Sequence, residues 1–191
     1  MAKDLSRVRC PWVPLDDALY IEYHDKEWGV PLYDDQKIFE FLCLEAFQAG
    51  LSWRTVLYKR ENFKKAFANF APETVAKFTK SDSMRLMQDA GIIRNRLKIE
   101  ATIHNAKQFL EVQKEFGSFK KYMWQFVNGA PINNKIKTIA DYPEYTNEAL
   151  AFSKDLKKRG FKFLGPKVVY AHMQATGMVN DHAQDCFLYG K

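Results

Sequence analysis

The apolar residues of this chain repeat mainly with helical spacing, and no segment alternates polar and apolar residues for long enough to form a sheet strand. The stretch "DDQKIFEFLCLEAFQAG" predicts a helix with Asp34 or Asp35 as its N-cap and its end at Gly50. This helix is apolar on nearly all sides, so we expect it to be buried and central. Ser52 can cap a second helix, whose apolar stripe begins at Trp53.

Start and stop signals for helices continue along the rest of the chain. Pro72 opens a short helix to about Thr79, and "SDSMRLMQDAG" predicts another that is closed by Gly91. A long helix is expected over about 94–116 and a further one over 118–129. The stretch "APINNKIKTIADYP" then predicts an irregular crossover loop on the surface. The fold class is therefore all-α.

Composition adds limits to this picture. A chain of 191 residues with 47% hydrophobic and 15% aromatic residues predicts a single globular domain over residues 1–191, with helical lobes that share one cleft. We expect "MAKDLSR" at the start to be disordered, and neither a signal peptide nor a membrane span is predicted. The net charge of +6 favours a nucleic-acid partner only slightly, and three cysteines are too few for a disulfide framework, which favours a reducing cytosol.

The segment "TNEALAFSKDLKKRGFKFLGPKVVYAHMQATG" predicts two helices joined by a tight turn, over about residues 147–176. Gly160 and Gly165 permit that turn, and Lys162 and Lys167 are among the basic residues around it. One interpretation is an ordinary helical hairpin whose lysines are only solvated. The other is a helix-hairpin-helix element that binds a DNA backbone through these four residues without reading sequence.

A metal site is a second candidate feature. In "NDHAQDC", His182 and Cys186 are four positions apart, so on a helix they would face the same way. Cys10 and His24 lie near the other end of the chain, and two cysteines with two histidines suit zinc. Such a closed set of four would be structural. The spacing matches no zinc-finger pattern, so the alternative is hydrogen-bonded histidines and small apolar cysteines.

Glu45 is an acid in the least polar helix of the chain. A carboxylate there is costly unless it is paired, hydrogen-bonded or facing a cavity. One interpretation is an ion pair with an Arg or Lys. The other is a pocket acid among aromatic residues of the same third of the chain, an arrangement that suits a flat cationic ring. Aromatic residues at these spacings are also common in plain cores; here they are Trp12, Tyr20, Tyr23, Trp28 and Trp53.

Taken together, these segments resemble the 3-methyladenine DNA glycosylase I family of bacteria. The resemblance runs from about Arg9 to the C-terminus and rests on "RCPWV", "YHDKEWGVP", "FEFLCLEAFQAGLSW", "TVLYKRENF", "DAGIIRNRLKI", "LKKRGFKFLGP" and "MVNDHAQDC". It implies a helix-hairpin-helix DNA glycosylase fold. It also implies a structural zinc ion that joins the N- and C-terminal segments through Cys10, His24, His182 and Cys186.

The family's site residues fall on matching positions of this sequence. The resemblance places the pocket acid on Glu45, with Tyr23 beside it and Trp53 as the stacking ring. The loop that probes the gap left by a flipped nucleotide falls on Gly50 and Leu51. Other aromatic residues of the pocket fall on Trp12, Tyr20 and Trp28. Related glycosylases carry a catalytic Asp where this sequence has Asn180, although a shift of one residue would place Asp181 there.

The activity that the resemblance implies is excision of N3-methyladenine from alkylated double-stranded DNA, which releases free 3-methyladenine and leaves an abasic site. Such an enzyme flips the base out of the duplex. Glu45 would favour the cationic base rather than act as a strong acid or base, and water would attack directly because no pocket lysine is evident. The alternative is a non-catalytic, zinc-containing protein that binds damaged DNA. We expect a monomer in the bacterial cytoplasm.

Overall fold

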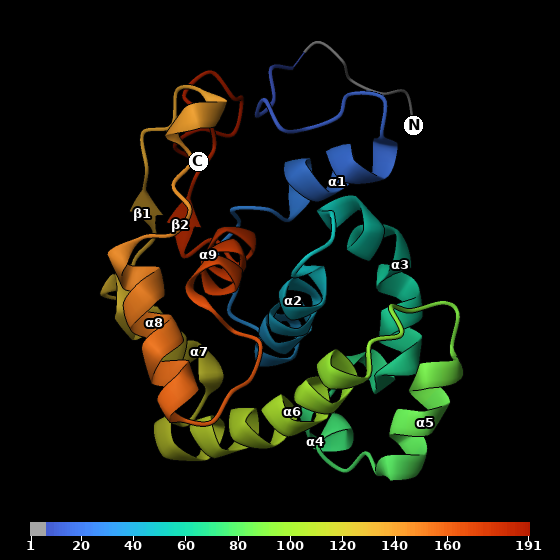
Figure 1. The fold of residues 1–191 in the computed structure, drawn as a ribbon. Coiled ribbons are helices and arrows are strands. Elements are labelled where there is room, and N and C mark those ends of the chain that lie inside the picture. The colour runs from blue at the N-terminus through green and yellow to red at the C-terminus, as the bar shows by residue number, and fades with distance from the viewer. Residues whose placement is uncertain (1–6) are drawn as a thin grey trace.

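The computed structural model describes residues 7–191, and over this range the chain is built almost entirely from helices (Figure 1). The predicted all-α class is thus confirmed. The disorder expected for "MAKDLSR" lies, except for Arg7, outside the described residues. In chain order the helices are α1 (Ala18–Lys26), α2 (Asp35–Gln48), α3 (Trp53–Ala66), α4 (Pro72–Val75), α5 (Lys80–Gln88), α6 (Arg96–Phe116), α7 (Phe119–Trp124), α8 (Asn147–Lys158) and α9 (Pro166–Ala175).

Helix α2 lies at the centre of the molecule and packs against α3, α6, α7 and α9 (Figure 1). Asp34 is its N-cap, and the side chain of Asp34 accepts a hydrogen bond from the first turn at 2.8 Å. Residues 38–47 are all buried, so the predicted central helix is confirmed. The buried run contains two acids. Glu40 is paired with Arg60 at 2.6 Å, whereas Glu45 reaches a cavity.

Several helix ends follow the local signals in the sequence. Ser52 caps α3 through a hydrogen bond to its first turn, and Pro72 is the first residue of α4. Gly117 ends α6 with a φ of +81°, which a residue with a side chain rarely adopts. Ser118 then caps α7 at once. These residues therefore fix where the chain changes direction on each side of the long α6.

Helices α8 and α9 form a hairpin that lies against the centre of the fold. Thr146 caps α8, Gly160 begins the turn with a φ of +88°, and Pro166 opens α9. The hydroxyl of Ser153 donates a hydrogen bond to the Leu164 carbonyl at 2.7 Å, which ties the turn to α8. Because α9 packs on both α8 and α2, the hairpin turn is rigidly placed relative to the helix that carries Glu45.

Several helices differ from the prediction; the one expected over 118–129, for example, is α-helical only over Phe119–Trp124 and continues as a short 3-10 helix over Gln125–Val127. Helix α1 was not expected, because the apolar residues of "ALYIEYHDK" do not keep to one face and only Tyr23 and His24 are buried. The short helix that begins at Pro72 ends at Val75 rather than at Thr79. Thr79 instead caps α5 through a reciprocal capping box with Asp82, and a cap residue cannot also continue the preceding helix.

The two ends of the described chain lie together (Figure 1). Strands β1 (Ile132–Asn133) and β2 (Val179–Asn180) pair in parallel, and β1 lies within the segment predicted as irregular. Two residues per strand are too few to leave an alternating pattern in the sequence. The Phe187 amide donates to the Val8 carbonyl at 2.9 Å, which joins the C-terminal segment to the N-terminal one. Within residues 7–191 no helix has the length and apolar character of a membrane span.

Candidate functional site

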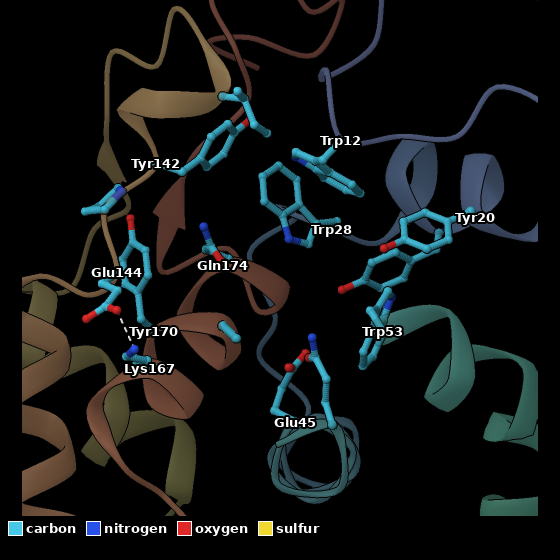
Figure 2. Close-up of a pocket in the computed structure, with 15 residues that line it drawn as sticks. Trp12, Tyr20, Trp28, Glu45, Trp53, Tyr142, Glu144, Lys167, Tyr170 and Gln174 are labelled. Carbon is cyan, nitrogen blue, oxygen red and sulfur yellow. Dashed lines mark hydrogen bonds and ion pairs between the residues drawn. The ribbon is translucent and has the colours of Figure 1, made fainter. Parts of the chain in front are cut away.

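A cavity of about 350 Å³ lies between α1, α2 and α3 on one side and α9 with residues 139–144 on the other (Figure 2). Small-molecule sites span about 300–1,000 Å³, so this one suits a ligand as small as a single ring system. The structure brings together around it all six residues that the sequence suggested for a pocket: Trp12, Tyr20, Tyr23, Trp28, Glu45 and Trp53.

Glu45 projects from α2 toward the centre of the cavity (Figure 2). The residue is 4% exposed, and burial raises the pKa of its carboxyl group to about 8. Within residues 7–191 no side chain forms an ion pair with Glu45, so the alternative of a structural Arg or Lys partner does not hold for this part of the chain. Burial therefore favours the neutral form of this acid, and a cation beside it would favour the ionised form.

Aromatic rings form the wall around this acid. The ring centroids of Tyr23 and Trp53 are 5.0 Å apart, and those of Trp12 and Trp28 are 4.7 Å apart with the planes steeply inclined. The Trp53 indole N–H is buried and has no hydrogen-bond partner among the described residues. Flat apolar faces, one acid and one unpartnered donor suit a flat ring that carries positive charge and an acceptor atom.

Asp181 supports the opposite wall from behind. Its carboxylate accepts hydrogen bonds from the Tyr170 hydroxyl at 2.6 Å, the Gln174 amide at 2.7 Å and the Asn134 amide at 2.7 Å. Asp181 is fully buried and does not line the cavity, whereas Tyr170 and Gln174 do. The network fixes the orientation of the two side chains that a ligand would meet on this wall.

Asn180 and Asp181 were the two candidates for the position of a catalytic Asp, and the structure shows where each of them lies. Asn180 does not line the cavity either, and its side-chain oxygen accepts the backbone N–H of His182 at 3.1 Å. The acids that line the cavity, among the described residues, are Glu45 and Glu144. Neither Asn180 nor Asp181 therefore brings a carboxylate to the cavity.

Four side chains from the two ends of the chain meet in one buried cluster: Cys10, His24, His182 and Cys186. Their ligand atoms lie within 4.8 Å of one another. The Cys10 Sγ is 3.4 Å from His182 Nδ1, and the Cys186 Sγ is 3.6 Å from His24 Nε2 and from His182 Nδ1. In a tetrahedral zinc site, bond lengths of about 2.3 Å to S and 2.05 Å to N put neighbouring ligands about 3.6 Å apart. The cluster can therefore hold a metal ion.

The second nitrogen of each imidazole is also occupied in the way that a metal ligand requires. His24 Nδ1 lies 2.8 Å from Asp25, whose carboxylate is in turn held by two hydrogen bonds from Arg9, at 2.8 and 2.7 Å. His182 Nε2 lies 3.2 Å from the Trp28 carbonyl and donates to it. These contacts leave His24 Nε2 and His182 Nδ1 free to bind a metal through their lone pairs.

The two residues expected to probe DNA lie directly after α2. Gly50 has a φ of +81°, and the Leu51 amide closes the turn by donating to the Gln48 carbonyl at 2.6 Å. We call residues 48–51 the 48–51 turn. Gln48 lines the cavity, whereas the Leu51 side chain is 44% exposed. One turn thus carries both a cavity residue and an exposed apolar side chain.

The four hairpin residues expected to bind DNA lie in two different places, the hairpin turn and the rim of the cavity. Gly160, Lys162 and Gly165 lie in the turn between α8 and α9, where the Lys162 side chain is exposed. Lys167 instead lines the cavity rim and forms an ion pair with Glu144 (Figure 2). The expectation that no lysine would lie at the pocket was therefore wrong. Its ammonium group is largely exposed and is paired with the carboxylate of Glu144.

The sequence interpretation missed the part of the cavity wall that follows residue 130. Tyr142 comes from the segment predicted as an irregular surface loop, Glu144 follows directly after it, and no local pattern pointed to either residue. Tyr170 and Gln174 are four positions apart and share one face of α9, as Gln48 shares a face of α2 with Glu45. Helical spacing from Glu45 was a signal that could have found Gln48, whereas the sequence offered no cavity residue on α9 from which Tyr170 and Gln174 could be found.

The protein has a helical fold, a carboxyl group inside an aromatic cavity, and a hairpin with a basic turn next to that cavity. These features define a class of helical proteins that bind a flat ring. Comparison with known proteins narrows this class. Residues 12–189 match the family model described as methyladenine glycosylase, and the chain belongs to that family.

Relatives and solved structures agree with this assignment. The chain is 50% identical over 181 residues to DNA-3-methyladenine glycosylase 1 of Escherichia coli, covering 95% of this chain and 96% of that protein. It is 49% identical over 178 residues to DNA-3-methyladenine glycosylase of Haemophilus influenzae, covering 93% and 96%. A crystal structure of 3-methyladenine DNA glycosylase I superposes with a TM-score of 0.92 at 48% identity, covering 95% of this chain and all of that one.

Proposed function

We propose that this protein is a DNA-3-methyladenine glycosylase that acts in DNA repair by hydrolysing the bond between N3-methyladenine and its sugar. The observation that carries the proposal is Glu45, a buried and unpaired acid in an aromatic cavity. Two relatives with about 50% sequence identity bear the name of this enzyme. One similar structure, with a TM-score of 0.89 and 41% identity, is a complex with 3-methyladenine.

The chemistry of the substrate fits this cavity. Methylation of adenine at N3 leaves a positive charge on the base, which weakens the bond to the sugar. The ionised form of Glu45 would hold that cation against the aromatic wall that contains Tyr23 and Trp53, and neutral bases would lack this attraction. Flipping the nucleotide costs a few kcal/mol, which contacts in the cavity and along the backbone must offset. We propose direct attack by water and no covalent intermediate.

The hairpin of α8 and α9 would bind the DNA backbone as a helix-hairpin-helix element. A side chain built at Gly165 meets no atom within 4 Å, so a phosphate can approach the backbone N–H groups there. Contacts of this kind do not depend on the DNA sequence. An enzyme whose lesion can arise anywhere in DNA needs such sequence-independent binding. Gly160 and Lys162 would belong to the same contact surface, and Lys167 would lie where that surface meets the cavity.

We propose Zn²⁺ as the metal of the buried cluster. Two thiolates and two imidazoles are a donor set that zinc prefers, and four protein ligands leave no position for a reactive water. The ion would therefore be structural, and its effect would be to hold Cys10 and His24 against His182 and Cys186.

The test of function is release of the free base. Purified protein incubated with alkylated duplex DNA should release 3-methyladenine, measured by chromatography, and should leave abasic sites. Glu45→Gln keeps the shape of the side chain but cannot ionise, and we expect single-turnover excision to slow by about 100-fold. Glu100→Gln, an exposed change on α6, should leave the rate as it is.

The competing hypothesis is a non-catalytic protein that binds damaged DNA. It has no need of an acid inside the most apolar helix. It would be supported by tight binding to alkylated DNA with no release of base, and Glu45→Gln would then change nothing that the assay measures.

A further inference from the structure

Lys98 is a buried cation that the proposed function leaves without a role. It lies in the first turn of α6 and is 7% exposed, and burial lowers the pKa of its ammonium group. Among residues 7–191 no carboxylate pairs with it. A methionine or leucine would fill the same space without burying a charge, so packing does not explain a lysine at this position.

The partners of Lys98 lie in another helix. Its Nζ donates one hydrogen bond to the Phe47 carbonyl at 2.8 Å and another to the Ala49 carbonyl at 2.5 Å. These oxygens belong to the C-terminal end of α2, where carbonyl groups have no amide partner within the helix and carry its negative partial charge. Lys98 is thus a C-terminal cap supplied from α6.

The two carbonyls flank Gln48, the first residue of the 48–51 turn. Gln48 lines the cavity, and Leu51, three residues on, is exposed. Gly50 lies between them at a φ of +81°, and a Cβ built on it would meet nothing within 4 Å. A glycine in open space gives the chain freedom to move, so the turn needs an anchor elsewhere if Leu51 is to stay fixed.

We propose that Lys98 is a positioning residue for base extrusion: its ammonium group fixes the 48–51 turn so that Leu51 is held against the duplex while Gln48 stays in the cavity. This inference rests on the proposed function. An apolar side chain that fills the gap left by a flipped nucleotide acts only if it is held rigidly, because a small misplacement loosens every later contact. Lys98 touches neither base nor DNA in this view and acts through the turn.

The test compares Lys98→Met with wild type in two assays that need different parts of the site. Free 3-methyladenine, titrated against tryptophan fluorescence, needs only the cavity, and we expect its affinity to be unchanged. Single-turnover excision from methylated duplex needs the turn as well, and we expect it to slow by about 10- to 100-fold. The fluorescence of 2-aminopurine placed next to the lesion should show less unstacking at saturating protein.

Two further variants distinguish this role from a general loss of structure. Lys107→Met, an exposed change on the same helix, should match wild type in both assays. In a Leu51→Ala background, Lys98→Met should cause little additional slowing, because both changes remove the same contact. If Lys98→Met does not fold, Lys98→Gln keeps one donor for the carbonyls and should show the same selective loss in milder form.

Several results would overturn the inference. Excision at the wild-type rate by Lys98→Met is one. Equal losses of free-base affinity and excision, in Lys98→Met or Lys98→Gln, are another, because they would show that Lys98 supports the cavity as a whole. Fully additive losses with Leu51→Ala are a third. If wild-type protein binds the free base but excises nothing, the proposed function fails, and that failure is seen before any variant is made.

Discussion

At the scale of single residues, Glu45 links base recognition to the pH dependence of folding. Burial raises the pKa of its carboxyl group from 4.5 to about 8. Between these two values the folded protein holds a proton that the unfolded chain has released. The contribution of Glu45 to the free energy of unfolding therefore falls as the pH rises through this window, by about 1.4 kcal/mol per pH unit, and is level outside it.

We expect Glu45→Gln to remove this dependence. The amide cannot ionise, so the variant should be more stable than wild type at pH 8, and the difference should shrink toward zero as the pH falls to about 4.5. Urea unfolding of both proteins at several pH values measures the difference, and Glu100→Gln is the control for the change of charge. A variant that is less stable than wild type at pH 8, with a deficit that disappears toward acid pH, would mean that Glu45 is ionised and partnered in the folded state.

At the scale of elements, the hairpin turn makes a sharper prediction than the sequence alone allowed. Gly165 has an ordinary φ of −69° and free space around it, so Gly165→Val should fold normally. We expect it to weaken binding to damaged and undamaged duplexes by a similar factor, because the contact is to the backbone. Fluorescence anisotropy with both duplexes measures this.

Gly160→Val is the informative comparison for that experiment. Its φ of +88° is strained for any residue with a side chain, so the melting temperature should fall as well as DNA affinity. Normal DNA binding by a well-folded Gly165→Val would remove this turn from the DNA surface.

The helix boundaries that are set by residues at the boundary itself could be predicted from the sequence. Ser52, Pro72 and Gly117 each set a helix boundary through their own hydrogen bonds or backbone preference, and such signals are visible in the sequence. Helix α1 and the pairing of β1 with β2 depend on contacts between distant segments. No local pattern encodes those contacts, and they became visible only in three dimensions.

Some residues of the cavity could likewise be predicted from their local sequence, and others could not. Glu45 could be found from its sequence context, because an acid in an apolar helix is anomalous by itself. Tyr142 and Glu144 could not, because their place at the cavity depends on how the segment after β1 returns over α9. Asp181 is a further case. It is a buried support rather than a cavity acid because it binds Tyr170 and Gln174 of α9 and Asn134 of a distant segment.

At the scale of the whole molecule, a metal ion held by the four residues of the buried cluster would close the chain into a loop, since Cys10 and His182 are 172 positions apart. On the cross-link model, closing so long a loop stabilises the folded state by roughly 4–5 kcal/mol, and a metal that can dissociate lies at or below this figure. Cys186→Ser should therefore lower the melting temperature and the bound zinc together. Elemental analysis and calorimetry measure both, and Cys43→Ser, which changes a buried thiol outside the cluster, should keep the zinc content of wild type.

The protein that remains folded in Cys186→Ser should still prefer 3-methyladenine to adenine, because Glu45 is unchanged. Wild-type protein that contains no stoichiometric metal after purification without chelators would contradict this account of the cluster.

The cluster of Cys10, His24, His182 and Cys186 lies beside the cavity, and this position determines when the cavity can form during synthesis. The Trp12 ring lies 5.3 Å from the His24 ring, and the Trp28 ring lies 4.8 Å from the His182 ring, so the histidines of the cluster support the aromatic wall directly. During synthesis, Cys10 leaves the ribosome 172 residues before His182. A chain that has not yet reached His182 and Cys186 thus carries Glu45 but lacks the support of its aromatic wall, and full capacity to hold a base would be reached only after these two residues have been made and metal is at hand.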